Sequence, residues 1–139
     1  MNILFMCVAN SARSQLAEGL AKSMFGDRAE IQSAGSQPSK VNPFAVEVMK
    51  EIGIDLSKHY SKAIDDLSPR FLVGLTYVIT LCAEEVCPIL VSKATKLHWP
   101  MPDPAGHDQM SQRERIELFR ETRDAIKTRL TEFKAGLET

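Results

Sequence analysis

The fold is decided by residues 3–14, Ile3-Leu4-Phe5-Met6-Cys7-Val8-Ala9-Asn10-Ser11-Ala12-Arg13-Ser14. The apolar run at 3–6 is typical of a buried strand, and the residues from Ser14 onward have the periodicity of a helix. A loop between a strand and a helix start can turn successive amide groups inward and add the partial positive charge of the helix. This stretch therefore predicts an oxyanion cradle around Cys7.

A cysteine and an arginine give the predicted cradle its chemistry. The Arg13 guanidinium can hold two oxygens of a tetrahedral oxyanion, and the cradle favours the thiolate of Cys7, which is the nucleophilic form. The oxyanion-binding residues are expected to be Val8, Ala9, Asn10, Ser11, Ala12, Arg13 and Ser14. A Cys-X5-Arg spacing is weak evidence alone, and the strand before it and the helix after it make it specific. The alternative interpretation is a small buried Cys7 and a surface Arg13.

The size and composition are those of one soluble domain. The chain has 139 residues and a net charge of −1, so we expect a single domain over 1–139 and no nucleic acid or membrane partner. The apolar stretches are too short for a membrane span or a signal peptide. Three cysteines without an export signal favour a reduced, cytoplasmic protein in which any disulfide is transient and catalytic.

Strands and helices are expected to alternate along the chain. Apolar runs predict strands at 2–8, 29–33, 76–81 and 96–99, and helical patterns begin at 14, 43 and 112. Asn42-Pro43 predicts a capped helix start, and Ser111 with Glu114 predicts a capping box. Residues 55–68 are expected to be loop with short helical turns. This alternation predicts an α/β fold, a parallel sheet covered by helices on both faces.

In a parallel sheet, ligands bind beyond the carboxyl ends of the strands. Cys7 follows the first predicted strand, Cys82 follows the third, and Asp103 lies in the loop after the fourth. We therefore expect all three at one end of the molecule. A carboxylic acid at Asp103 could protonate the leaving oxygen of a bound oxyanion, a role that the nearby anion would favour. The alternative is a turn-forming aspartate before Pro104.

Cys82 and Cys87 are more typical of a redox pair than of a metal site. A zinc site requires closer cysteine pairs, and the three histidines show no ligand spacing. On a helix the Cα atoms of residues five apart lie about 8.6 Å apart, whereas a disulfide requires less than about 7 Å. Bridging them would thus require local unwinding. The three thiols suggest a relay in which Cys7 attacks, Cys82 resolves and Cys87 carries the oxidation outward. The alternative is a pair of structural cysteines.

Short motifs from most of the chain point to one family. They are Cys7 to Gly19, Ser33-Ala34-Gly35, Val41-Asn42-Pro43, Val78-Ile79-Thr80-Leu81-Cys82, Cys87-Pro88 and His98-Trp99 with Asp103-Pro104-Ala105. Together they closely resemble the arsenate reductases of the low-molecular-weight tyrosine-phosphatase superfamily. The resemblance implies a four-stranded parallel sheet flanked by helices, and an arsenate reductase active in arsenic resistance.

The resemblance also implies residue roles in the first half of the reaction. Cys7 would attack arsenate, or bind phosphate or sulfate as analogues. Asn10 would brace the loop and Ser14 would stabilise the Cys7 thiolate. Asp103 would protonate the departing hydroxyl.

In the second half, the resemblance implies that Cys82 attacks the Cys7–arsenic adduct and releases arsenite. Cys87 would then take over the disulfide and present it to an external reductant. That reductant is thioredoxin in the best-known branch, with glutaredoxin and glutathione as the alternative. Two departures from that branch are the shorter spacer between Cys82 and Cys87 and Ala12 in place of a frequent cysteine.

No cofactor is implied as a requirement, but some relatives bind a potassium ion beside the loop. The matching positions here are Asn10, Glu18, Ser33 and Asp65. The resemblance therefore implies a potassium site at these positions.

Two rival functions use the same cradle. A protein tyrosine phosphatase would share Cys7, Arg13 and Asp103, because phosphate and arsenate have the same shape and charge. It would not need Cys82 or Cys87, although an arsenate reductase could retain residual phosphatase activity. A non-catalytic redox switch or anion sensor would need neither the acid nor three placed thiols.

Overall fold

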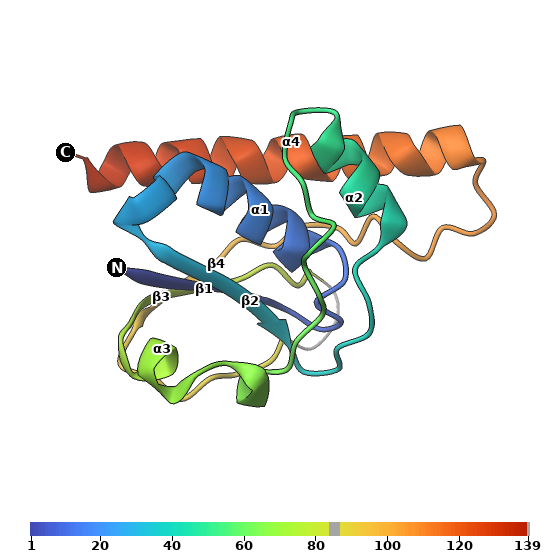
Figure 1. Ribbon diagram of the computed structural model, residues 1–139. Coiled ribbons are helices and arrows are strands. Elements are labelled where there is room, and N and C mark those ends of the chain that lie inside the picture. Colours follow the sequence, from blue (N-terminus) through green and yellow to red (C-terminus); the bar gives the residue numbers. More distant parts are fainter. Residues whose placement is uncertain (84–86, 139) are drawn as a thin grey trace.

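The computed structural model describes residues 1–83 and 87–138. Its centre is a four-stranded sheet in the order β2-β1-β3-β4, and all its neighbouring strands are parallel (Figure 1). The strands are β1 (Asn2–Cys7), β2 (Glu30–Gly35), β3 (Leu75–Thr80) and β4 (Thr95–His98). The predicted parallel sheet is thus confirmed, with strand ends within two residues of those expected.

Helices cover both faces of the sheet, but unequally. One face carries α1 (Arg13–Phe25), α2 (Pro43–Lys50) and α4 (Gln112–Leu137), which contact one another (Figure 1). The other face carries the short α3 (Pro69–Val73) and its flanking loops. The predicted α/β class with helices on both faces is therefore confirmed.

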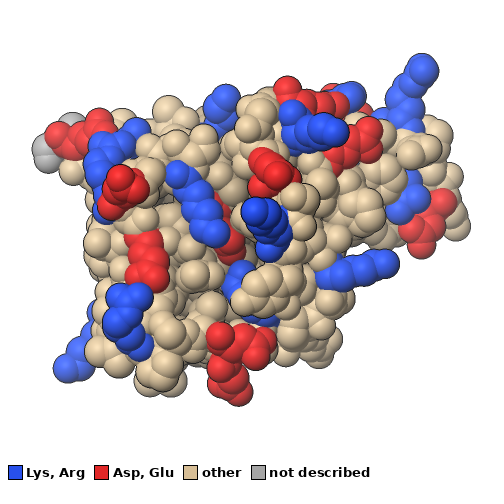
Figure 2. Space-filling model, viewed as in Figure 1, with Lys and Arg blue, Asp and Glu red and all other residues tan. Residues whose placement is uncertain are grey.

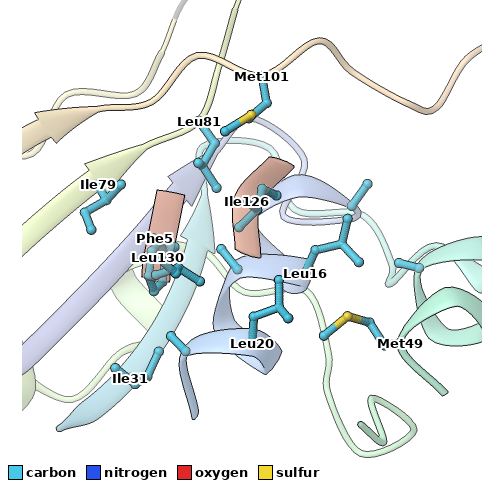
Figure 3. Packing of buried hydrophobic residues seen from close by; sticks show 14 of the residues in the cluster. Phe5, Leu16, Leu20, Ile31, Met49, Ile79, Leu81, Met101, Ile126 and Leu130 are labelled. Atoms are coloured by element: carbon cyan, nitrogen blue, oxygen red, sulfur yellow. The ribbon is translucent and has the colours of Figure 1, made fainter. Parts of the chain in front are cut away.

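The two faces of β1 supply two separate cores. Phe5 belongs to the larger cluster, where it packs with Leu16 and Leu20 of α1 and with Ile126 and Leu130 of α4 (Figure 3). The alternate residues Leu4 and Met6 belong to a smaller cluster with Phe71 of α3. Successive side chains of a strand point to opposite faces, so burial on both sides explains why β1 is apolar throughout.

The helix starts follow the predicted caps. The Asn42 side chain accepts a hydrogen bond from the Phe44 amide, and Ser111 and Glu114 form both bonds of a capping box. The sequence analysis did not predict α3, although Ser68 caps it and Pro69 is its first residue. A helix of five residues is too short to show an apolar period.

The sheet register brings the strand ends together. Cys7 is opposite Gly35 on β2, Met6 is opposite Thr80 on β3, and Thr80 is opposite His98 on β4. The segments that follow β1, β3 and β4 therefore begin at one edge of the sheet. This edge is where the sequence predicted the site.

The viewed surface of the molecule carries mixed charge. Lysine and arginine are interspersed with aspartate and glutamate over this face, without a large area of one sign (Figure 2). In the described part of the chain, no helix combines the length and the apolar character needed to cross a bilayer.

Candidate active site

Cys7 is the last residue of β1, and its thiol is buried at the mouth of α1. Its Sγ lies 2.8 Å from the hydroxyl oxygen of Ser14, which stands in the first turn of that helix. Charged acceptors form the stronger hydrogen bonds, so this hydroxyl can donate to a thiolate. The N-cap residue of α1, Ala12, has no side-chain acceptor for the helix amides, and a helix start of this kind favours an anion.

The backbone of the loop after Cys7 is turned with its carbonyls outward. The carbonyls of Val8, Ala9 and Ser11 accept hydrogen bonds from the amides of residues 37, 39 and 42, at 2.9, 3.1 and 2.9 Å. The carbonyl of Asn10 accepts from the Ser61 hydroxyl at 2.7 Å. In a trans peptide the N–H points opposite to the C=O. The amides of residues 9–12 therefore point away from this supporting shell, as an anion cradle requires.

Asn10 holds the turn of the loop. It is completely buried and has a positive φ of 49°, a conformation that asparagine tolerates better than most residues. Its side-chain oxygen accepts from the Lys62 amide at 2.8 Å and from Gln15 at 3.0 Å, while its amide nitrogen donates to Ser14 at 2.7 Å. Asn10 thus links the loop, the helix and a distant segment, and it orients the hydroxyl that contacts Cys7.

Gly35 allows the last strand residues to lie against the loop. A Cβ at this position would collide with the Val8 carbonyl and would lie 2.9 Å from the backbone of Cys7 and Asn10. Contacts this short are not found for real side chains, so only glycine permits the approach. The Gly35 amide donates to the Lys62 carbonyl at 2.8 Å, which joins β2 to the same distant segment.

Arg13 and Asp103 meet on the open side of the cradle. The Arg13 guanidinium donates to the carbonyls of Leu81 and Met101 at 3.4 and 3.1 Å, and lies 3.7 Å from the Asp103 carboxylate. Asp103 is exposed, and its other oxygen accepts from the Ala105 amide at 3.0 Å. Asp103 therefore stabilises a turn before Ala105, as the alternative interpretation expected. It also reaches Arg13 at the predicted site.

The three thiols are reduced, and two of them adjoin this edge of the sheet. Leu81, the residue before Cys82, donates to the Met6 carbonyl at 2.9 Å, so Cys82 follows directly from the strand beside β1. Cys82 is buried, whereas Cys87 is partly exposed. The spacer between them falls mostly on residues 84–86, outside the described residues, and the local rearrangement expected for a Cys82–Cys87 bridge stays a prediction. Cys7 and Cys82 thus lie at the same end of the sheet, where β1 and β3 end.

One of the residues nominated for potassium, Glu18, is a buried carboxylate that already has cationic partners. Glu18 accepts from the Ser33 hydroxyl, and its oxygens lie 3.3 Å from the Lys62 ammonium and 2.7 Å from the Lys22 ammonium. Burial opposes ionisation, but Lys22, Lys62 and Ser33 outweigh it and hold the pKa of Glu18 below its usual value.

The nominated set does not fit an added cation as it stands. The Lys62 ammonium is buried against Glu18, and the Lys62 amide occupies the side-chain oxygen of Asn10. Asp65, the fourth nominated residue, is exposed in a single 3₁₀ turn at Ile64–Asp66. A potassium ion would have to displace the lysine.

His59 lies against the same carboxylate. Its Nδ1 is 3.0 Å from the Gln15 side-chain oxygen and 3.3 Å from Glu18. Burial lowers the pKa of His59 and outweighs the attraction of Glu18, with Lys22 and Lys62 acting in the same direction as burial. The imidazole is therefore neutral at pH 7 and acts as a hydrogen-bonding group in this cluster.

Sequence reasoning missed most of this supporting shell. Ser61 and Lys62 lie in a segment predicted only as loop, and no local pattern marks a lysine that will be buried by a carboxylate 44 positions away. Gly35 had a usable signal, since a glycine at the end of a buried strand indicates close backbone approach.

The sequence matches the low molecular weight phosphotyrosine protein phosphatase family over residues 2–139. Arsenate reductase 1 of Staphylococcus epidermidis is 41% identical over 133 residues, which are 94% of this chain and 93% of that protein. An arsenate reductase solved in a phosphate-binding state is 30% identical, with a TM-score of 0.75 and 97% of both chains covered. A thioredoxin-dependent arsenate reductase of Corynebacterium glutamicum is 27% identical with a TM-score of 0.67, over 97% of this chain and 62% of that one.

Proposed function

Because the chain belongs to the low molecular weight phosphotyrosine protein phosphatase family, we propose that it acts as an arsenate reductase whose three cysteines form a thiol relay. The observation that carries this proposal is the common edge of the sheet from which the Cys7 and Cys82 segments begin, with Cys87 nearby in the chain. A phosphatase of this family needs the thiol of Cys7 alone. The named similarity to arsenate reductases supports the same choice.

The first step is attack of the Cys7 thiolate on arsenic. The amides of residues 9–12 and the Arg13 guanidinium hold the oxygens of arsenate, and Ser14 donates to the thiolate before attack. Asp103, 3.7 Å from Arg13, gives its proton to the departing hydroxyl, which leaves as water. The product is an adduct with a bond between Cys7 Sγ and arsenic(V).

The next two steps move the oxidation outward. Cys82 attacks Cys7 Sγ, a disulfide forms, and the electron pair of the broken sulfur–arsenic bond reduces arsenic to arsenite. Cys87 then attacks Cys82 Sγ, which frees Cys7 as a thiolate and leaves a Cys82–Cys87 disulfide. An external dithiol reduces that disulfide. Such a cycle requires a reducing compartment, and we therefore place the protein in the cytoplasm.

Arsenite formation tests this function directly. The reduced protein is supplied with arsenate and either a purified thioredoxin system or a glutathione–glutaredoxin system, and arsenite is measured over many turnovers. We expect sustained arsenite formation with the thioredoxin system, as in the thioredoxin-dependent relative. Hydrolysis of p-nitrophenyl phosphate without arsenite formation under either system would instead favour the tyrosine phosphatase.

We also propose that Lys62 supplies the positive charge for which a potassium ion was predicted. The support is its buried ammonium 3.3 Å from Glu18. Arsenite formation is then expected to be equal in potassium chloride and choline chloride at the same ionic strength. In Lys62→Met, the buried Glu18 loses one of its two ammonium partners, and activity should become potassium-dependent or be lost. Potassium dependence of the unaltered protein would contradict the proposal.

A further inference from the structure

The last thiol exchange needs a proton acceptor that the cradle does not provide. Cys87 must attack as a thiolate, and an ordinary cysteine is only a few per cent thiolate at pH 7. The amides and Ser14 serve Cys7 at the end of β1. Cys87 lies in a different segment, after β3, and requires its own partner.

Cys87 lines a small cavity of about 250 Å³ between its own segment and the ends of β3 and β4. The polar side chains that share this cavity with it are Thr80, Lys96 and His98. A lysine ammonium has no lone pair and a threonine hydroxyl is not a base near neutral pH. Among the described residues that line the cavity, the imidazole of His98 is the group suited to accept a thiol proton.

Thr80 fixes the orientation of this imidazole. The two residues are paired across β3 and β4, and the Thr80 hydroxyl oxygen lies 2.7 Å from His98 Nδ1 and 3.4 Å from the Leu97 carbonyl. When the hydroxyl donates to that carbonyl, it accepts the proton of Nδ1. The lone pair of the neutral ring is then on Nε2, the nitrogen not held by Thr80.

We propose that His98 is the base that takes the thiol proton of Cys87 in the second exchange, an inference that rests on the proposed arsenate reductase function. The proton passes from Cys87 Sγ to His98 Nε2. The Cys87 thiolate then attacks Cys82 Sγ, the Cys7–Cys82 bond breaks, and Cys7 leaves as a thiolate. No electrons enter or leave in this step, because one disulfide is exchanged for another.

Other charged groups also face His98 and determine the control. Lys96 shares its strand and the Cys87 cavity, while Arg129 and Glu132 of α4 line a second cavity that His98 borders on its other side. Arg129 and Glu132 carry opposite charges, so their effects on the His98 imidazole act in opposite directions. Lys96→Gln removes a positive charge beside Cys87 without removing a base, and it is therefore the matched control.

The test measures how fast iodoacetamide alkylates Cys87 in the reduced protein as a function of pH. Peptide mass spectrometry quantifies alkylation of Cys87 separately from that of Cys7 and Cys82, so the other two cysteines need not be mutated. His98→Asn keeps an amide that can donate to Thr80 but removes the base. We expect its alkylation at pH 7 to fall about tenfold, since an ordinary thiol is only a few per cent ionised there. The rates should converge above about pH 9, where the thiol ionises without help.

A purely structural role would give a different pattern. If His98 only supported the fold, His98→Asn would change the rate by the same factor at every pH, and that result would overturn the assignment. An unchanged profile would overturn it as well. We expect Lys96→Gln to move the pH 7 rate much less than His98→Asn. His98→Gln provides a second variant, and the thermal melting of both confirms that they remain folded.

The alkylation assay uses no arsenate, so it separates this inference from the proposed function. If His98→Asn shows the pH-dependent loss of alkylation rate but the unaltered protein forms no arsenite, His98 is supported as the proton acceptor of Cys87 and the reductase function is contradicted. If arsenite forms but the alkylation rate of Cys87 does not depend on His98, the reductase function is supported and the assignment of His98 is contradicted.

Discussion

The loop after β1 and the segment after β3 both carry cysteines of the proposed relay, yet they are built in opposite ways. In the first loop, the backbone carbonyls are held by a surrounding shell, and Asn10 and Ser14 are fully buried. In the second, the described residues from Cys87 onward are irregular, and Ile89 and Val91 are 86% and 95% exposed.

This difference matches the two kinds of chemistry that the proposed mechanism needs. Electrostatic stabilisation of an oxyanion requires donors that are already in place, because reorganisation at the moment of reaction costs energy. Thiol–disulfide exchange requires each sulfur to reach the next in turn, and so depends on access. The first loop provides fixed donors, and the second segment provides an accessible thiol.

The largest effect is expected from Cys7→Ser, which removes the proposed nucleophile of both arsenate reduction and phosphate-ester hydrolysis. Arsenate reduction and hydrolysis of p-nitrophenyl phosphate should both fall by about 10⁴-fold or more. Arsenite and nitrophenol assays on the same preparation measure the two losses. Turnover by this variant would show that Cys7 is not the nucleophile. It would also contradict the different chemical roles proposed for the first loop and the second segment.

Cys82→Ser should separate the two activities. The first loop remains intact, so slow hydrolysis of p-nitrophenyl phosphate continues, while arsenate reduction is lost because no thiol attacks Cys7 Sγ. The same pair of assays applies. Arsenite formation over many turnovers would mean that the second segment has no part in the reaction.

Cys87→Ser should stop the reaction one step later. Each molecule is expected to form about one arsenite and then stall, because the oxidation cannot leave the Cys7–Cys82 pair. Mass spectrometry of the spent protein under non-reducing conditions should show a disulfide between these two residues. Continued turnover with thioredoxin would show that the reductant reaches that first disulfide directly.

Stability measurements sharpen the structural side of the comparison. Asn10→Ala leaves buried partners unsatisfied and forces alanine into a left-handed conformation, so we expect a loss of about 3 kcal/mol in the free energy of unfolding. The matched change in the exposed segment, Ile89→Ala, should alter it by less than about 0.5 kcal/mol. Urea unfolding followed by circular dichroism measures both. Equal losses would contradict the contrast between the buried first loop and the exposed second segment.

A smaller effect is expected from pH, through the buried cluster beside the first loop. Since the pKa of His59 is lowered in the folded state, the unfolded chain binds a proton first as pH falls below about 6.5. Glu18 has a lowered pKa and therefore acts in the same direction at lower pH. Unfolding free energy should thus decrease as the pH falls from 7 to 4, and His59→Gln should reduce the decrease between about pH 7 and 5. If the unfolding free energy of His59→Gln decreased with falling pH as much as that of the unaltered protein, other groups would be responsible for the decrease.

Sequence reasoning reached the elements whose signals are local. The apolar strands, the Asn42 and Ser111 caps and the Cys-X5-Arg loop each depend on neighbours in the chain, and the family resemblance followed from them. The supporting shell depends on contacts between distant residues, such as Lys62 with Glu18, and no local pattern encodes their burial. The short α3 was missed for another reason, because its five residues are too few to show an apolar period even though Ser68 and Pro69 mark its start.

The inward amides of the first loop have a practical consequence for protein engineering. The proposed anion donors are peptide groups, whose carbonyls are bonded to residues 37, 39 and 42. The side chains of Val8 and Ala9 are only partly buried and have no part in that hydrogen bonding. A cysteine-free variant of the outer segment could therefore carry a small fluorescent amino acid at position 9. Such a chain would report occupancy by phosphate or arsenate optically, in a molecule that no longer reduces arsenate.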